Sequence, residues 1–226
     1  MNDVPIITID GPSGTGKGTL CHRLAQYLGW HSLDSGAIYR VLALAATRAH
    51  VRADQVDDLV QLALHLPLRF SRSGESQTLV YLGDEDISAP IRTESCGQLA
   101  SQIAQIPRVR VALLERQRAF AQTPGLVADG RDLGTVVFPE AALKIYLDAS
   151  EEIRAKRRYE QLNKSEKHVS LAQVVDELQK RDARDRSRTH APLVAAHDAI
   201  HVDTTGLRID EVFQHILHIV SQRLGS

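Results

Sequence analysis

Gly-Pro-Ser-Gly-Thr-Gly-Lys-Gly-Thr, residues 11–19, is the stretch that decides the fold of this chain. The apolar run Val4–Ile9 before it is typical of a strand, and Leu20–Ala25 after it is typical of a helix. Small residues between a strand and a helix let backbone N–H groups close around a phosphate, while the helix N-terminus and Lys17 add positive charge. The stretch therefore predicts a cradle for the phosphates of a nucleoside triphosphate. We expect ATP to contact Gly11, Pro12, Ser13, Gly14, Thr15, Gly16, Lys17, Gly18 and Thr19.

The order of residues after Lys17 departs from the commonest form of this motif. In that form a Ser or Thr follows the lysine directly, whereas here Gly18 follows and Thr19 comes one residue later. The Gly-Lys-Gly-Thr variant resembles the P-loop of nucleoside monophosphate kinases. The alternative is a chance glycine turn, and the strand and helix that accompany the motif argue against it.

The bulk properties describe one sizeable domain or a domain with an insert. The chain has 226 residues, is 43% hydrophobic and carries a net charge of −1, so no global charge attracts a nucleic acid polymer or an acidic membrane. Cys21 and Cys96 have no metal or redox spacing, and no run approaches the roughly 18 apolar residues of a membrane span. We expect a cytoplasmic protein without a signal peptide.

Strands that alternate with helices predict an α/β fold with a central parallel sheet in three layers. The expected helices are residues 17–28, 35–49, 54–66, 91–105, 108–122, 151–163, 171–188 and 209–224. The expected strands are residues 6–9, 68–70, 78–82, 85–87, 126–128, 143–147 and 199–202. We treat residues 1–226 as a single kinase-like domain, with a small antiparallel insert at 53–106. A basic helix and the polar segment 164–170, which we expect to be mobile, form a short lid at 154–170.

Two loops at the carboxyl ends of strands carry candidate site residues. In Asp34–Arg40, Arg40 lies on the side that a second phosphate would approach, and we favour a functional role for it and for Ser35, although a helix cap followed by a surface arginine is the alternative. Asp129–Asp132 follows a predicted central strand, which is where α/β active sites are built. A plain Asp-Gly turn would not need two acids flanking an arginine, so we favour a functional role.

The helix 171–188 has a face that changes character along its length. At 100° per residue, the apolar positions Leu171, Val174 and Leu178 form one inward stripe. The same stripe continues with the charged residues Arg181, Asp185 and Arg188. Buried charges need partners, and a phosphate with a ribose would supply them, whereas the alternative is a solvated helix end with salt bridges.

A basic cluster precedes the polar segment 164–170. Its members are Arg154, Lys156, Arg157 and Arg158. Such clusters are often solvated faces, but next to a polar segment this one predicts a lid that closes over a triphosphate.

Five stretches together resemble bacterial-type cytidylate kinases, over nearly the whole chain. They are residues 11–19, 33–40 (Leu-Asp-Ser-Gly-Ala-Ile-Tyr-Arg), 128–135 (Ala-Asp-Gly-Arg-Asp-Leu-Gly-Thr), 181–186 (Arg-Asp-Ala-Arg-Asp-Arg) and 191–193 (Ala-Pro-Leu). No motif position departs from the family's pattern, and Gly18 belongs to the family's own form. The resemblance implies a P-loop NTPase fold, an acceptor-binding insert and transfer of the γ-phosphoryl group of ATP to CMP or dCMP in pyrimidine metabolism.

The resemblance also implies roles for individual residues. Lys17, Arg131 and Arg188 would act on the transferring group, and Arg157 and Arg158 would contact ATP. Acceptor contacts would come from Ser35, Arg40, Ser101, Arg110, Arg131, Asp132, Arg181, Asp185 and Arg188. Mg²⁺ would accompany ATP, with Thr19 a candidate ligand directly or through water. We expect a monomer whose partners are ATP, CMP and dCMP.

Two other functions stay open on sequence grounds. The first is a related kinase that acts on AMP or UMP. The second is a nucleotide-dependent switch with no small acceptor, which would need the P-loop but neither the insert nor the charged stripe of helix 171–188.

Overall fold

The computed structural model describes residues 4–73, 77–163 and 169–225, and it divides the chain into two compact units. The first unit comprises Met1–Asp34 with Gln117–Ser226, and the second comprises Ser35–Arg116. The predicted insert 53–106 falls within the second unit. Residues 164–168 of the segment that we expected to be mobile lie outside the described residues.

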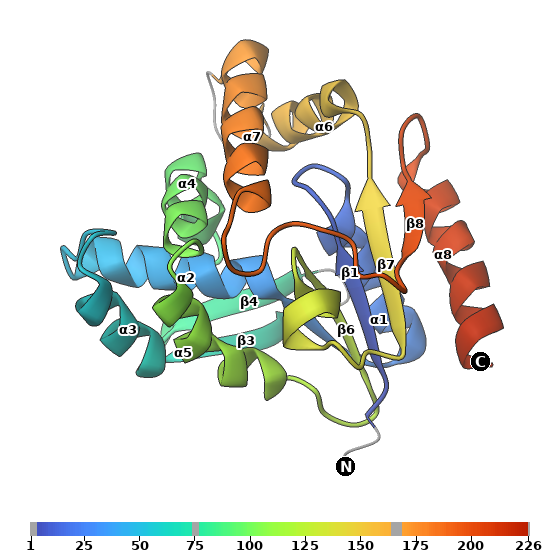
Figure 1. Ribbon diagram of the computed structural model, residues 1–226, viewed down its shortest axis with the longest axis horizontal. Helices are drawn as coiled ribbons and strands as arrows, with labels where there is room; N and C mark the ends of the chain where they lie inside the picture. The colour runs from blue at the N-terminus through green and yellow to red at the C-terminus, as the bar shows by residue number, and fades with distance from the viewer. Residues whose placement is uncertain (1–3, 74–76, 164–168, 226) are drawn as a thin grey trace. The chain divides into compact units, whose positions relative to one another are not determined.

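A five-stranded parallel sheet organises the first unit, as the alternating pattern predicted (Figure 1). Its spatial order is β2-β6-β1-β7-β8. The strands are β1 (Ile6–Asp10), β2 (His31–Asp34), β6 (Leu126–Gly130), β7 (Leu143–Asp148) and β8 (Ile200–Asp203). The register pairs Asp34 with Asp129 and Asp10 with Gly130, so acidic residues from three neighbouring strands reach the carboxyl edge of the sheet together.

Two helices bury the main core of this unit against the sheet. They are α1 (Lys17–Leu28) and α8 (Ile209–Leu224), and both have the bounds that the sequence predicted. The core consists of apolar residues from the strands and from one face of each helix, among them Ile7, Ile9, Ile145, Leu147, Leu20, Leu24, Phe213 and Ile216. Each fully buried side chain of this size contributes about 1.5–3 kcal/mol, so this core holds the end of β1 and the start of α1 in place around the glycine-rich turn.

Helices α6 (Glu151–Asn163) and α7 (Leu171–Arg186) follow β7 and lie beyond the carboxyl end of that strand (Figure 1). A small core joins them, with Ala155 and Leu162 from α6 and Val174 and Leu178 from α7. The apolar stripe predicted on α7 is therefore confirmed at Val174 and Leu178. It is wrong at Leu171, which is 47% exposed because it begins the helix directly after the capping residue Ser170.

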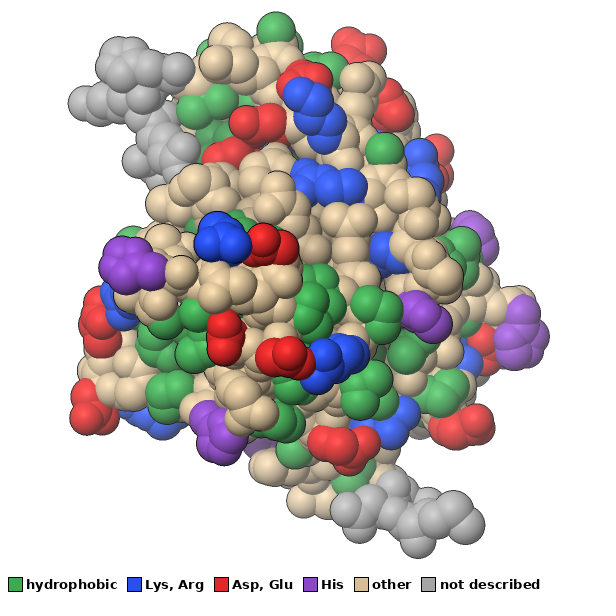
Figure 2. Space-filling model, turned by 60° about the vertical axis from the view of Figure 1, so that its left-hand side comes forward, with side chains coloured by type: hydrophobic (Ala, Val, Ile, Leu, Met, Phe, Trp, Pro, Cys, Tyr) green, Lys and Arg blue, Asp and Glu red, His purple; other side chains and the backbone are tan. Residues whose placement is uncertain are grey.

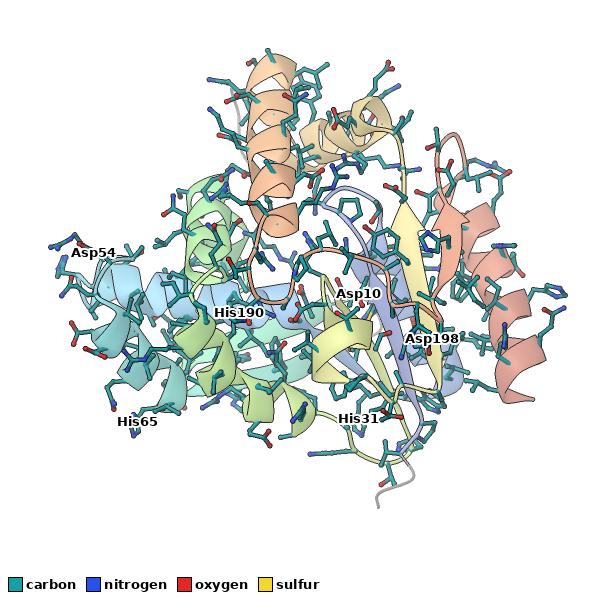
Figure 3. The ribbon with its side chains drawn as sticks, in the orientation of Figure 1. Asp10, His31, Asp54, His65, His190 and Asp198 are labelled. Atoms are coloured by element: carbon teal, nitrogen blue, oxygen red, sulfur yellow. The ribbon has the colours of Figure 1, made fainter. Side chains whose placement is uncertain are left out.

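A π-helical turn, η2 (Leu133–Val137), follows β6 and was not predicted. Its first two backbone N–H groups, those of Leu133 and Gly134, donate to the carboxylate of Asp10 at the end of β1. Figure 3 labels Asp10 beside this turn. Turns of this kind are frequent at functional sites.

The second unit consists of helices and a three-stranded antiparallel sheet, in the order β3-β4-β5. Its elements are α2 (Ser35–Arg48), α3 (Val56–Leu64), β3 (Leu68–Ser73), β4 (Gln77–Leu82), β5 (Glu85–Asp86), the 3-10 turn η1 (Pro90–Arg92), α4 (Glu94–Ile103) and α5 (Pro107–Arg118). The antiparallel strands confirm the change of pattern seen in the sequence.

Several helix ends differ from the predicted bounds for local reasons. The predicted helix 91–105 begins only at Glu94, because the Thr93 hydroxyl caps it by accepting from the N–H of Cys96 at 3.4 Å. Helix α5 ends at Arg118 rather than at residue 122, and the N–H groups of Phe120 and Ala121 donate to the carbonyl oxygens of Gln117 and Arg118 in tighter turns. Helix α3 is shorter than 54–66 at both ends.

The surface carries no extended field of one charge on the face that Figure 2 shows. Basic and acidic side chains are interspersed there, in keeping with the net charge of −1. Among the described residues, no helix is long and apolar enough to cross a membrane.

Candidate active site

The glycine-rich turn has a backbone that only glycine tolerates at its key positions. Gly11, Gly14 and Gly16 have φ values of +144°, +83° and +93°. A Cβ on Gly11 would lie 2.0 Å from the carbonyl oxygen of Leu147, and one on Gly14 would lie 2.7 Å from that of Arg154. At Gly18, by contrast, a Cβ would meet nothing within 4 Å. The turn is thus closely packed against β7 and α6 before α1 begins.

Lys17 is buried inside this turn. Its ammonium donates to the carbonyl oxygen of Pro12 at 2.6 Å and to the hydroxyl of Thr15 at 3.3 Å. Burial lowers the pKa of Lys17 well below its usual value, and the positive charge of Arg131 lowers it further. A buried cation next to another cation is stabilised by an anion, so this arrangement suits a phosphate.

Two carboxylates at the carboxyl edge of the sheet are protonated more readily than usual. Burial, together with the nearby charge of Asp34, raises the pKa of Asp129 to about 8. Burial also raises the pKa of Asp10 to about 6, although its bonds from Leu133 at 3.0 Å and Gly134 at 2.8 Å oppose the shift. Sequence analysis did not assign a role to Asp10. Its place as the last residue of a strand, directly before the glycine-rich turn, was the available signal.

Asp185 brings together two of the arginines that the sequence singled out. Nε of Arg131 donates to its Oδ2 at 3.0 Å, and Arg188 forms an ion pair with its Oδ1. Burial by itself would raise the pKa of Asp185, but Arg131, Arg188 and Arg181 hold it below its usual value. The carboxylate therefore stays charged and fixes two guanidinium groups side by side.

The first unit carries three more of the predicted site residues. Asp132 is buried at the start of η2, and the hydroxyl of Thr135 donates to its carbonyl oxygen. Arg181 is half-buried, and its charge acts on both Lys17 and Asp185. Thr19 is exposed in the first turn of α1.

The three arginines of the basic cluster on α6 have different hydrogen-bond partners. Arg154 is buried and bonds to the glycine-rich turn, with Nη1 donating to the carbonyl oxygen of Ser13 at 3.1 Å. Arg157 donates to the hydroxyl and the carbonyl oxygen of Thr204, at 2.9 and 2.8 Å. Arg158 donates to Oε1 of Gln161. Of the two arginines predicted to contact ATP, Arg157 is thus engaged with the loop after β8.

In the second unit, four predicted acceptor contacts lie on α2, α4 and α5. Ser35 is buried at the start of α2, and Arg40 donates to the carbonyl oxygens of Ile91 and Thr93 at 2.7 and 3.2 Å. Arg110 is buried, with its guanidinium 5.7 Å from the centre of the Tyr39 ring. The hydroxyl of Ser101 is buried and has no hydrogen-bond partner among the residues that the structure describes.

The donor set of the first unit fits Mg²⁺ carried by a nucleotide. The described residues contain no group of three or more His, Cys, Asp or Glu side chains that would hold a metal by themselves. Mg²⁺ usually keeps several waters and binds through one or two carboxylates plus substrate phosphates, so a full protein cage is not needed. The buried carboxylate of Asp129, whose ionised form burial disfavours, would gain from such a cation.

Comparisons with known proteins identify the family of the chain. The profile of the family described as cytidylate kinase matches residues 7–222. The cytidylate kinase of Aeromonas salmonicida (strain A449) is 58% identical over 221 residues, which cover 98% of this chain and 96% of that protein. The cytidylate kinase of Proteus mirabilis (strain HI4320) is 56% identical over 214 residues, covering 95% of each.

A solved structure supports the fold. A gluconokinase from Sinorhizobium meliloti 1021 matches with a TM-score of 0.50 and 12% identity, covering 96% of this chain and 92% of that chain. At this identity the likeness concerns the fold alone.

Proposed function

Since the chain belongs to the cytidylate kinase family, we propose that the residues gathered around its glycine-rich turn carry out phosphoryl transfer. The enzyme phosphorylates CMP and dCMP with ATP. The observation that carries the proposal is a group of cations within one unit: Asp185 holds Arg131 and Arg188, and the charge of Arg131 acts on Lys17.

These cations would stabilise the charge of the transferring phosphoryl group. Transfer from ATP to a monophosphate requires no covalent enzyme intermediate, only in-line alignment of donor and acceptor, charge neutralisation and exclusion of water. Asp185 holds Arg131 and Arg188 before the reaction begins, so they would need little reorganisation during it. Lys17, bonded to the carbonyl oxygen of Pro12, would turn to the phosphates of ATP.

The acceptor would be recognised by its base, its sugar and its phosphate. Cytosine offers an N4 donor with N3 and O2 acceptors, so a carboxylate with hydroxyl and guanidinium donors would match it. Asp132 would supply the carboxylate, while Ser101, whose hydroxyl is buried, Arg110 and Ser35 would supply donors. Uracil would leave these groups mispaired, and rejection of that kind can be large.

The remaining acceptor contacts would divide between sugar and phosphate. Arg181 and Asp185 would hold the ribose or deoxyribose, and Arg40, Arg131 and Arg188 the phosphate. Within the predicted lid 154–170, the part beyond Arg154 would close to keep water from the phosphoryl group, while Arg154 stays bonded to the glycine-rich turn.

Mg²⁺ would be held mainly by the phosphates of ATP, with Asp129 and Thr19 as the protein's contributions. When bound, it would neutralise phosphate charge and orient the γ-phosphoryl group. We also propose that the enzyme works as a monomer in the cytoplasm.

An acceptor panel tests the proposed specificity. ADP formation is measured with ATP and Mg²⁺ in the presence of CMP, dCMP, UMP or AMP, or with no acceptor. We expect CMP and dCMP to support turnover far better than UMP and AMP. Equal rates with all four would contradict selective recognition of cytosine, and turnover that ignores the acceptor would favour a nucleotide-dependent switch instead.

A further inference from the structure

Arg154 joins three elements of the first unit from a buried position on α6. Its side chain is 2% exposed. Nε donates to the carbonyl oxygen of Ala149 at 3.0 Å, Nη1 donates to that of Ser13 at 3.1 Å, and Nη1 lies 2.6 Å from Oδ2 of Asp182. One guanidinium therefore contacts the loop between β7 and α6, the glycine-rich turn and α7.

On one side, Arg154 helps to form the wall of the glycine-rich turn. The Cβ atom of Arg154 lies where a side chain on Gly14 would clash, at 2.9 Å, and its backbone carbonyl oxygen is closer still. The bond from Nη1 to the carbonyl oxygen of Ser13 adds a polar contact to this packing. A shift of Arg154 would therefore displace the backbone that we expect to hold the phosphates of ATP.

On the other side, Arg154 reaches the part of α7 that carries the charged stripe. Its partner Asp182 is 4% exposed and follows Arg181 directly. One helical turn further along the same buried face lies Asp185, which holds Arg131 and Arg188. The Arg154–Asp182 pair therefore connects the glycine-rich turn to the helix whose Asp185 holds these arginines.

A buried ion pair of this kind adds little to the free energy of unfolding. Removing two charges from water costs about as much as their attraction returns, and a well-packed apolar pair often does as well. What the pair adds is a restricted geometry, because a planar guanidinium with two directed hydrogen bonds and a buried ion pair tolerates little displacement.

We propose that Arg154 is a positioning residue that sets the alignment between the ATP-binding turn and the arginines held by α7. This inference rests on the proposed function, which places donor phosphates at the turn and the acceptor at α7. Since phosphoryl transfer depends on alignment, a small displacement would slow the transfer step more than it would weaken the binding of either substrate.

Arg154→Lys tests the role while keeping a charge for Asp182. A lysine ammonium cannot maintain the contacts to Ser13, Ala149 and Asp182 in one planar arrangement. We expect kcat to fall by about 10- to 100-fold, with KM for ATP and for CMP changed by less than about threefold. The matched control is Lys180→Ala, which removes an exposed ion pair between Lys180 and Asp176 on α7. It should leave kcat and both KM values near those of the unchanged enzyme.

A second variant separates positioning from stability. Arg154→Ala would leave Asp182 buried and unpaired, so it is expected to unfold easily. The double substitution Arg154→Met with Asp182→Leu replaces the pair by apolar side chains of similar size and should recover thermal stability. We expect its kcat to stay at least tenfold low. A stable double variant with normal kcat, or an Arg154→Lys variant whose loss appears only in KM, would overturn the inference.

The two proposals can fail separately. If the unchanged enzyme does not prefer CMP and dCMP, the proposed acceptor recognition fails whatever Arg154 does. If the unchanged enzyme turns over CMP and the Arg154 variants match it in kcat, only the positioning role fails.

Discussion

At the scale of single residues, Gly11 and Gly18 have opposite requirements within one turn. Gly11 has a φ of +144° and no space for a Cβ, whereas Gly18 lies in α1 with open space around it. We expect Gly11→Ala to lower the free energy of unfolding by about 2 kcal/mol or more, from backbone strain and the clash with Leu147. Gly18→Ala should change it by about 1 kcal/mol or less. Urea unfolding of the two variants compares them directly, and equal losses would contradict this account.

Lys17 is expected to show a conflict between stability and activity. Its charge is buried, and that burial lowers its pKa, so the folded protein gains little stability from it. Lys17→Met should therefore unfold at the same or a higher temperature than the unchanged enzyme, while kcat falls by about 100- to 1000-fold. Thermal unfolding and steady-state kinetics on one preparation test both expectations. A variant that is active, or that is inactive because it is unfolded, would refute the assignment.

Asp129 should make stability depend on pH. Burial raises its pKa from 3.8 to about 8, so the folded protein binds this proton more tightly than the unfolded chain does. The stability gained through that proton is present below about pH 4 and is lost as the pH rises through about 8. Asp129→Asn removes this loss and is expected to be more stable than the unchanged enzyme at pH 8, by on the order of 1–3 kcal/mol. Denaturant unfolding without Mg²⁺ at pH 3, pH 5 and pH 8 should show no advantage at pH 3, a small one at pH 5 and the largest at pH 8.

At the scale of elements, the C-terminal end of α7 and the residues just beyond it should respond unequally to loss of their charges. Asp185→Ala would leave Arg131 and Arg188 close together in a buried site without their shared carboxylate, and a loss of about 3–5 kcal/mol is expected. Arg188→Ala leaves Asp185 paired with Arg131, so a smaller loss of about 1 kcal/mol is expected. Both substitutions should abolish most CMP turnover. The opposite order of stabilities in urea unfolding would show that Asp185 does not hold the two arginines together.

Helix α7 also shows what hydrophobic periodicity can and cannot predict about burial. A repeat of 100° per residue correctly predicted that Val174, Leu178 and Asp185 share a buried face of α7. It also placed Leu171 on that face. Leu171 stands at the helix start, lies outside the core shared by α6 and α7, and is exposed. Periodicity assigns a residue to a face, and only the neighbouring element determines how much of that face is covered.

At the scale of the whole molecule, the predicted acceptor contacts divide between the two units. Ser35, Arg40, Ser101 and Arg110 belong to the second unit, while Asp132 and the charged residues of α7 belong to the first. Amide hydrogen exchange followed by mass spectrometry tests each set by itself. An ATP analogue alone should slow exchange around the glycine-rich turn, and CMP alone should slow it around Ser101 and Arg110. Protection by CMP that never includes α4 or α5 would remove those residues from the acceptor site.

The sequence by itself determined the parts of this protein that depend on local rules. The glycine-rich turn, the bounds of α1 and α8 and the alternation of strands and helices follow from backbone freedom, capping and hydrophobic period. The tertiary structure decided which charges lie together and which are buried. Ser13 and Arg154 are 141 positions apart, and Arg131 and Asp185 are 54 apart. Burial and pairing depend on chain segments brought together by folding, so no local pattern marks Arg154 as buried, Asp10 as the anchor of η2 or Asp129 as a carboxylate with a raised pKa.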